Sequence, residues 1–226
     1  MTTQRRNAVS LAASGASAAR LQTLNSNSLI AAAQELADRD RYLKRVHERY
    51  GPPPMWARRP GFPTLLRIIL EQQVSLISAR AMLQRLTTNI QPFTPERFIE
   101  LGEEYLRSLG LTRQKSHYCV QLATAFRNRE LDRLSRLPDA DARDSLLRIK
   151  GIGPWTADIY LLMALRRADI WPQGDIALAT AFAELHDWKS RPDFARLAKA
   201  AVAWRPYRSV AARMLWQYYL GERGRL

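Results

Sequence analysis

A helical spacing of apolar residues runs through nearly the whole chain and restricts its fold more than any other feature. Residues such as Phe62, Leu65 and Leu66 recur as they do on the buried face of an amphipathic helix. No stretch alternates apolar and polar residues around a glycine-containing hairpin turn, and no internal repeat is present. The sequence therefore predicts an all-α fold with short connections, with helical runs at about 36–50, 62–70, 77–86, 95–100, 102–109, 113–129, 140–149, 154–166, 176–186, 192–203 and 206–221.

The first 28 residues differ in composition from the rest of the chain. They are rich in Ser, Ala and Asn, carry Arg5, Arg6 and Arg20, and no acidic residue precedes Glu35. This composition weakly resembles a transit peptide, but we interpret it as a flexible basic tail. A chain of 226 residues can form one domain or two closely packed lobes. In either case we expect residues 29–226 to form a single folded domain after the tail.

The charge balance indicates a polyanionic partner. The chain has 35 Lys and Arg against 21 Asp and Glu, a formal net charge of +14. Such a balance suits nucleic acid or an acidic membrane surface. No apolar run approaches the roughly 20 residues that span a bilayer. Cys119 is the only cysteine, which excludes an internal disulfide, a cysteine-rich zinc site and a four-cysteine iron–sulfur cluster.

A short link between two predicted helices, RIKGIGPWTAD at 148–158, carries unusual backbone chemistry. Gly151 can adopt positive φ to end the first helix, and Gly153 allows a close approach to the backbone. Pro154 can begin the second helix, where its missing N–H costs nothing. Outward-facing amides at such a turn bind phosphate without reading a base. The simpler alternative is a tight helical corner.

A second landmark follows after one helix. The loop at 171–174 contains proline and glycine and ends at Asp175, directly before another predicted helix. The positive end of that helix would favour an ionised carboxylate at Asp175. The alternative is an ordinary N-cap aspartate, which is common in helical proteins.

Together these segments resemble the helix-hairpin-helix superfamily of base-excision DNA glycosylases. The likeness is carried by the hairpin, the Asp175 loop and three other segments, FPTLLRIILEQQVSLISARAM (62–82), GLTRQKSHYCVQLA (110–123) and WRPYRSVAARMLW (204–216). It covers about 36–221 and is strongest for 3-methyladenine DNA glycosylase II, the alkylbase branch, in its compact form without an N-terminal sheet domain. The resemblance implies a two-lobed helical bundle with the active-site cleft between the lobes.

The resemblance also implies roles for individual residues in catalysis. Asp175 falls on the catalytic aspartate of the family. Trp155 stands where lyase-competent relatives carry a Schiff-base lysine, which implies a monofunctional enzyme without abasic-site lyase activity. Trp155 and Tyr207 would form walls of the base pocket. Ile159 stands where close relatives can carry a tyrosine, which leaves the pocket shape and the lesion range open.

The remaining roles concern DNA. Gln73 falls at the position of the wedge that fills the gap left by a flipped base, and Gln72 would contact the opposite strand or the turn. The resemblance implies a monovalent cation held by hairpin carbonyls, and no iron–sulfur cluster or other metal. Lys150 lies before the glycines, outside the Schiff-base position. The predicted contacts to the DNA backbone come from Lys150, Gly151, Ile152, Gly153 and Thr156.

Two further hypotheses compete with an alkylbase glycosylase acting in base-excision repair on bases such as 3-methyladenine and 7-methylguanine. One is a noncatalytic helix-hairpin-helix protein that only binds DNA. The other is a glycosylase of the same fold that removes uracil or an oxidised purine. Such bases are neutral and leave less readily than alkylated ones. We expect a monomer that binds damaged duplex DNA and no membrane. The expected location is the cytoplasm, with the nucleoid, in a prokaryote or the nucleus in a eukaryote.

Overall fold

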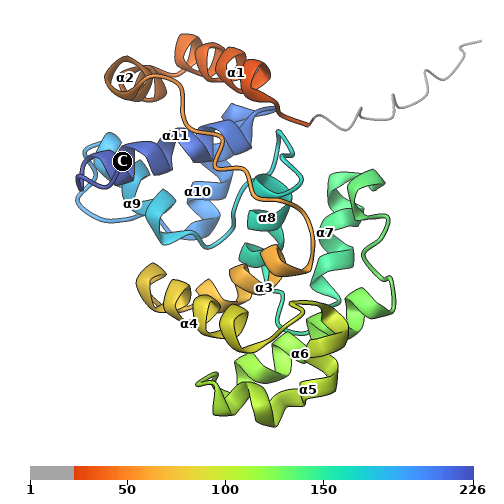
Figure 1. Cartoon of the computed structure of the whole chain (residues 1–226). Helices are drawn as coiled ribbons and strands as arrows, with labels where there is room; N and C mark the ends of the chain where they lie inside the picture. The colour runs from red at the N-terminus through yellow and green to blue at the C-terminus, as the bar shows by residue number, and fades with distance from the viewer. Residues whose placement is uncertain (1–22) are drawn as a thin grey trace, which may run out of the picture.

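The computed structural model describes residues 23–226, and the regular secondary structure of this part of the chain is helical (Figure 1). Its one β-type contact is an isolated bridge between Thr23 and Arg167. The prediction of an all-α fold is therefore confirmed. The α-helices are α1 (Ser26–Arg39), α2 (Arg41–Tyr50), α3 (Phe62–Glu71), α4 (Leu76–Asn89), α5 (Pro95–Ser108), α6 (Arg113–Arg127), α7 (Asp139–Leu147), α8 (Pro154–Met163), α9 (Ile176–Leu185), α10 (Phe194–Ala200) and α11 (Arg208–Gly221), with 3₁₀ turns at Leu134–Arg136 and Ala201–Trp204.

The helices pack in two groups. The C-terminal helix α11 packs against α1, α2 and α9, so the two ends of the described chain share one group. The other group comes from the middle of the sequence: α3 packs on α4, α6 and α8, α5 packs on α6, and α7 packs on α8. In Figure 1, α1, α2 and α11 lie in the upper part, and α4, α5 and α6 lie at the bottom in yellow and green. One continuous apolar core joins the two groups.

The folded part begins earlier than the sequence indicated. Leu24 is buried, and the Asn25 side chain accepts a hydrogen bond from the Ser28 N–H to cap α1. Residues 23–28, which we assigned to the tail, therefore belong to the fold, because a cap and an apolar contact extend α1 toward the N-terminus. The rest of the predicted tail, residues 1–22, lies outside the described residues.

Two helical boundaries have clear local causes. The predicted run at 36–50 is divided at Asp40, whose carboxylate accepts bonds from the Tyr42 and Leu43 N–H groups and so caps α2. Gly102 interrupts α5 with a φ of 69°, which agrees with the two separate runs predicted there. Among the helices between residues 23 and 226, none has both the length and the hydrophobicity needed to cross a bilayer.

Candidate active site

Asp175 is the buried N-cap of α9 and its carboxylate is held from several directions. Its side chain is 8% exposed. Oδ1 accepts a hydrogen bond from the Leu178 N–H at 2.9 Å and one from the Trp216 indole at 3.3 Å, and Oδ2 accepts one from the Trp155 indole at 2.9 Å. These three donors and the N-terminus of α9 stabilise a negative charge on a carboxylate that water barely reaches.

The bond between Trp155 and Asp175 also joins the two groups of helices. Trp155 is half-buried in the first turn of α8, whereas Asp175 begins α9. Trp216 lies on α11. It is buried, but its indole N–H is directed at Asp175, so it belongs to the site as well. A buried tryptophan N–H requires a hydrogen-bond acceptor. This requirement was the signal in the sequence that Trp216 would contact a polar group.

The two other predicted pocket residues do not bond to this carboxylate. Ile159 lies one helical turn after Trp155 and is 2% exposed, so its side chain belongs to the interior. Tyr207 is partly buried and forms the N-cap of α11, where its carbonyl accepts from the Ala211 N–H. The Asp175 oxygens are bonded by the two indoles and not by the Tyr207 hydroxyl.

The glycine hairpin between α7 and α8 is fixed to the end of α3. The Gln72 amide donates to the Gly151 carbonyl at 2.9 Å and to the Thr156 hydroxyl at 2.8 Å. Gly151 has a φ of 99°, and a Cβ there would collide with the Tyr118 ring. Gln72 therefore contacts the turn, one of the two partners predicted for it, and the Thr156 hydroxyl is used inside the protein.

The outer side of the hairpin is open. Gly153, the N-cap of α8, has an ordinary φ of −90°, and a Cβ there would meet nothing within 4 Å. The fold itself therefore places no steric demand for glycine at position 153. Lys150 is exposed, whereas the Ile152 side chain is buried in the core. Of the predicted contact residues, Ile152 and Thr156 can offer only their backbone to an outside partner.

The turn between α3 and α4 forms a second exposed surface. Gln73 is exposed and has a positive φ of 56°, an uncommon conformation for a residue other than glycine. Leu76 and Ile77, which follow it, are exposed apolar residues. The Lys115 ammonium donates to the carbonyls of Leu70 and Gln72, so it secures the end of α3. Burial in this position lowers the pKa of the Lys115 ammonium group.

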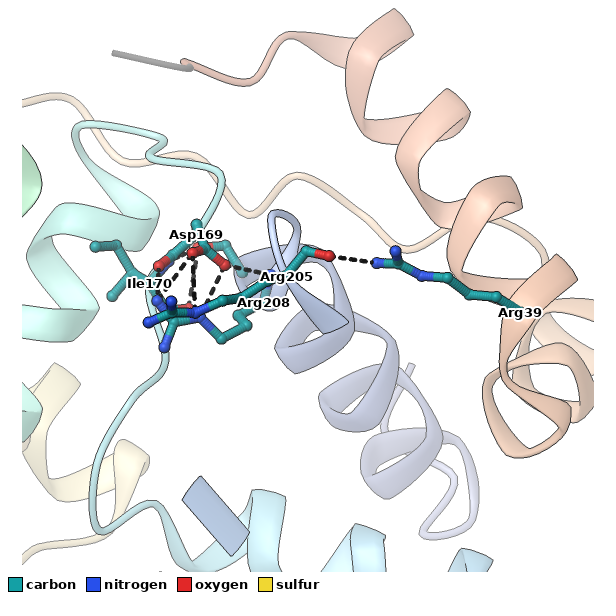
Figure 2. Close-up of polar contacts among 6 residues, drawn as sticks. Arg39, Asp169, Ile170, Arg205 and Arg208 are labelled. Atoms are coloured by element: carbon teal, nitrogen blue, oxygen red, sulfur yellow. Dashed lines mark hydrogen bonds and ion pairs between the residues drawn. The ribbon is translucent and has the colours of Figure 1, made fainter. Parts of the chain in front are cut away.

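The loop that carries Asp175 is anchored at its start (Figure 2). The Arg208 guanidinium donates to both carboxylate oxygens of Asp169, at 2.8 and 2.9 Å, and to the Asp169 carbonyl. The next residue, Ile170, exchanges hydrogen bonds with the buried Ser209 hydroxyl. These contacts fix the loop to the first turn of α11 five and six residues before Asp175.

The described residues contain no cluster of three or more His, Cys, Asp or Glu side chains that could hold a metal ion. A monovalent cation at the hairpin would depend on backbone carbonyls instead. The Gly151 carbonyl accepts from Gln72 and the Ile149 carbonyl accepts from the Ile152 N–H. Each oxygen keeps a second lone pair that could serve as a neutral donor to such a cation.

The chain is similar to known proteins in sequence and in fold. A family model described as HhH-GPD superfamily base excision DNA repair protein matches residues 66–206, which is more than half of the chain. The chain is 27% identical over 181 residues to DNA-3-methyladenine glycosylase 1 of Schizosaccharomyces pombe, covering 77% of this chain and 79% of that protein. It is 28% identical over 160 residues to the alkylbase DNA glycosidase-like protein mag2 of the same yeast, covering 68% and 75%.

A solved structure is similar in fold as well. The S. pombe 3-methyladenine DNA glycosylase Mag1, in complex with abasic DNA, superposes with a TM-score of 0.75 at 25% identity, covering 83% of this chain and 95% of that chain. The family match, the sequence relatives and this likeness agree with one another. The chain therefore belongs to the HhH-GPD superfamily of base excision DNA repair proteins.

Proposed function

We propose that the protein is a monofunctional DNA glycosylase that hydrolyses the N-glycosidic bond of alkylated bases in duplex DNA and leaves an abasic site. The observation that carries this proposal is the buried carboxylate of Asp175, held by two indole N–H groups and a helix N-terminus. The names of the similar yeast proteins support the choice of alkylated bases.

One carboxylate is enough for this reaction because of the charge on the leaving group. A base alkylated at a ring nitrogen is cationic, so the bond from C1′ to the base breaks with its electron pair moving onto the base. The base then leaves neutral and needs no proton from a general acid. The sugar becomes oxocarbenium-like, and the ionised Asp175 stabilises it and directs a water to C1′. As its oxygen bonds to C1′, this water gives up one proton to the surrounding solvent, which leaves a hydroxyl group on C1′.

Trp155 has two roles in this proposal. Its N–H holds Asp175 at 2.9 Å, which fixes the plane of the indole beside the carboxylate. A ring in that position attracts an electron-poor, cationic base by stacking and cation–π interaction. Tyr207 would stack on the other side, and Ile159 would shape the floor beneath Trp155. Tryptophan cannot form a Schiff base, so cleavage of the DNA strand is not part of the reaction.

Duplex DNA would lie across the two exposed turns. The open backbone at Gly153 admits a phosphate to the N-terminus of α8, with Lys150 as a charge contact. Gln73, exposed on its strained turn, would fill the gap that the flipped base leaves. The protein would act as a monomer in the compartment that holds the DNA, the nucleoid or the nucleus.

Substrate panels test this function directly. The wild-type protein is incubated with duplexes that contain methylated purines, uracil or 8-oxoguanine, and released bases are separated chromatographically. We expect release of methylpurines, and strand breaks only after alkali converts the abasic sites. Strand incision without alkali would contradict the monofunctional assignment. Binding of all three duplexes with no base release would favour a noncatalytic DNA-binding protein.

A further inference from the structure

A second carboxylate, Asp158, lies beneath the loop that presents Asp175. It follows Trp155 by three residues on α8 and is 2% exposed. Its Oδ2 accepts a hydrogen bond from the backbone N–H of Gln173 at 3.1 Å, two residues before Asp175. This contact links a buried side chain of one helix group to the loop of the catalytic candidate.

Arg143 of α7 completes a three-residue network. Its Nε donates to Asp158 Oδ1 at 2.7 Å, and one terminal nitrogen lies 3.5 Å from Asp158 Oδ2 and 3.2 Å from the Gln173 side-chain oxygen. The Arg143 side chain is 26% exposed and that of Asp158 is 3% exposed. Burial raises the pKa of the Asp158 carboxyl, while the bonds from Arg143 and Gln173 act in the opposite direction. An ionic pair in such a place is weak evidence for a role in stability alone.

The exposed tip of the loop lies between two buried segments: Trp171 packs against Trp204 on one side, and the buried Asp175 follows on the other. Gln173 and Gly174 are both exposed, and Gly174 has a φ of 80°. The anchors at Asp169 and Ile170 fix the start of the loop, several residues earlier (Figure 2). At the exposed tip itself, the hydrogen bonds to the helices below are those of Gln173, from its N–H to Asp158 and from Arg143 to its side-chain oxygen.

We propose that Asp158 and Arg143 are positioning residues for Asp175, which hold the tip of its loop so that the carboxylate stays in register with the Trp155 indole. This inference rests on the proposed glycosylase function. A displacement of about 1 Å at a reacting group can cost about 100-fold in rate. The pair should therefore affect the chemical step and leave the affinity for the product DNA unchanged.

The test compares Asp158→Asn, Asp158→Ala and Arg143→Gln with the wild type. Single-turnover release of methylpurines measures the chemical step, and binding to abasic duplex measures affinity. We expect release to slow by up to about 100-fold in Asp158→Ala, with near wild-type binding. Asp158→Asn keeps an acceptor for the Gln173 N–H, so its rate of release should lie between those of the wild type and Asp158→Ala. A shifted ¹H–¹⁵N signal of the Trp155 indole should accompany each loss of rate.

The matched control is Glu184→Gln, which breaks the 2.8 Å ion pair between Glu184 on α9 and Arg223, just after the end of α11. This variant should keep both the rate and the indole signal. Wild-type rate with an unshifted indole signal in Asp158→Ala would overturn the proposal. If that variant does not fold, the same result in Arg143→Gln overturns it. Equal loss of rate and of abasic-DNA binding would also overturn it, in favour of a general structural role.

The two proposals fail in distinguishable ways. A wild-type protein that releases no base from any duplex contradicts the glycosylase function. In that case the indole signal of the Asp158 variants still reports whether the pair positions Asp175. Wild-type release of methylpurines together with unchanged Asp158 variants contradicts the positioning role alone.

Discussion

At the scale of single residues, the site depends on where two indole N–H groups are directed. Both Trp155 and Trp216 donate to Asp175, and Asp175 also caps α9. A hydrogen bond to a charged group contributes roughly 1.5–3 kcal/mol, more than a neutral one. The carboxylate is thus fixed in place before substrate arrives, and its orientation needs little reorganisation during the reaction.

Replacing Trp155 with Phe tests this arrangement. The ring face remains for stacking, but the bond to Asp175 Oδ2 is lost, so we expect base release to slow by about 10-fold, with near wild-type binding of abasic DNA. Single-turnover kinetics and fluorescence anisotropy measure the two quantities. Trp204→Phe is the matched control, because its buried indole bonds to Asp40 instead, at 2.7 Å. That variant should lose stability and keep its rate; a slow Trp204→Phe and a fast Trp155→Phe would contradict the assignment.

At the scale of elements, the hairpin uses its two glycines for different physical reasons. Gly151 is required by the fold, since its φ is positive and the Tyr118 ring fills the space of a Cβ. Gly153 is not required by the fold, since its φ is ordinary and the space is open. A glycine that the protein does not need internally is consistent with the close approach of a phosphate from outside.

Alanine at each glycine separates these two reasons. Gly151→Ala should lower the free energy of unfolding by at least about 1–2 kcal/mol, because alanine is strained at positive φ even before the collision with Tyr118. Gly153→Ala should fold with nearly wild-type stability and bind abasic duplex more weakly. Thermal denaturation and DNA titration measure these effects. Wild-type DNA affinity in Gly153→Ala would contradict a phosphate contact at this turn.

At the scale of the whole molecule, helical period and family likeness predicted most of the architecture. The runs at 113–129 and 206–221 correspond closely to α6 and α11. The sequence did not predict the contacts that assemble the site, such as Trp216 to Asp175, Asp158 to Gln173, or Lys115 to the end of α3. These bonds join segments far apart in the chain, and a local period carries no information about them.

The single cysteine provides a probe of global stability. Cys119 lies fully buried in α6, and desolvation raises the pKa of its thiol to about 12. The thiolate is the reactive form, so the native protein should resist thiol reagents at neutral pH and react only on unfolding. Labelling rates across a urea series should follow the unfolding curve measured by circular dichroism. Rapid labelling of the native protein would show that α6 opens locally.

The most direct test of the whole account is base release by Asp175→Asn. Asparagine keeps the shape of the side chain and an acceptor for α9 but removes the negative charge that stabilises the sugar cation. The account predicts a folded protein that binds abasic duplex like the wild type and loses methylpurine release in single-turnover assays. An Asp175→Asn variant that releases methylpurines at nearly the wild-type rate would contradict it.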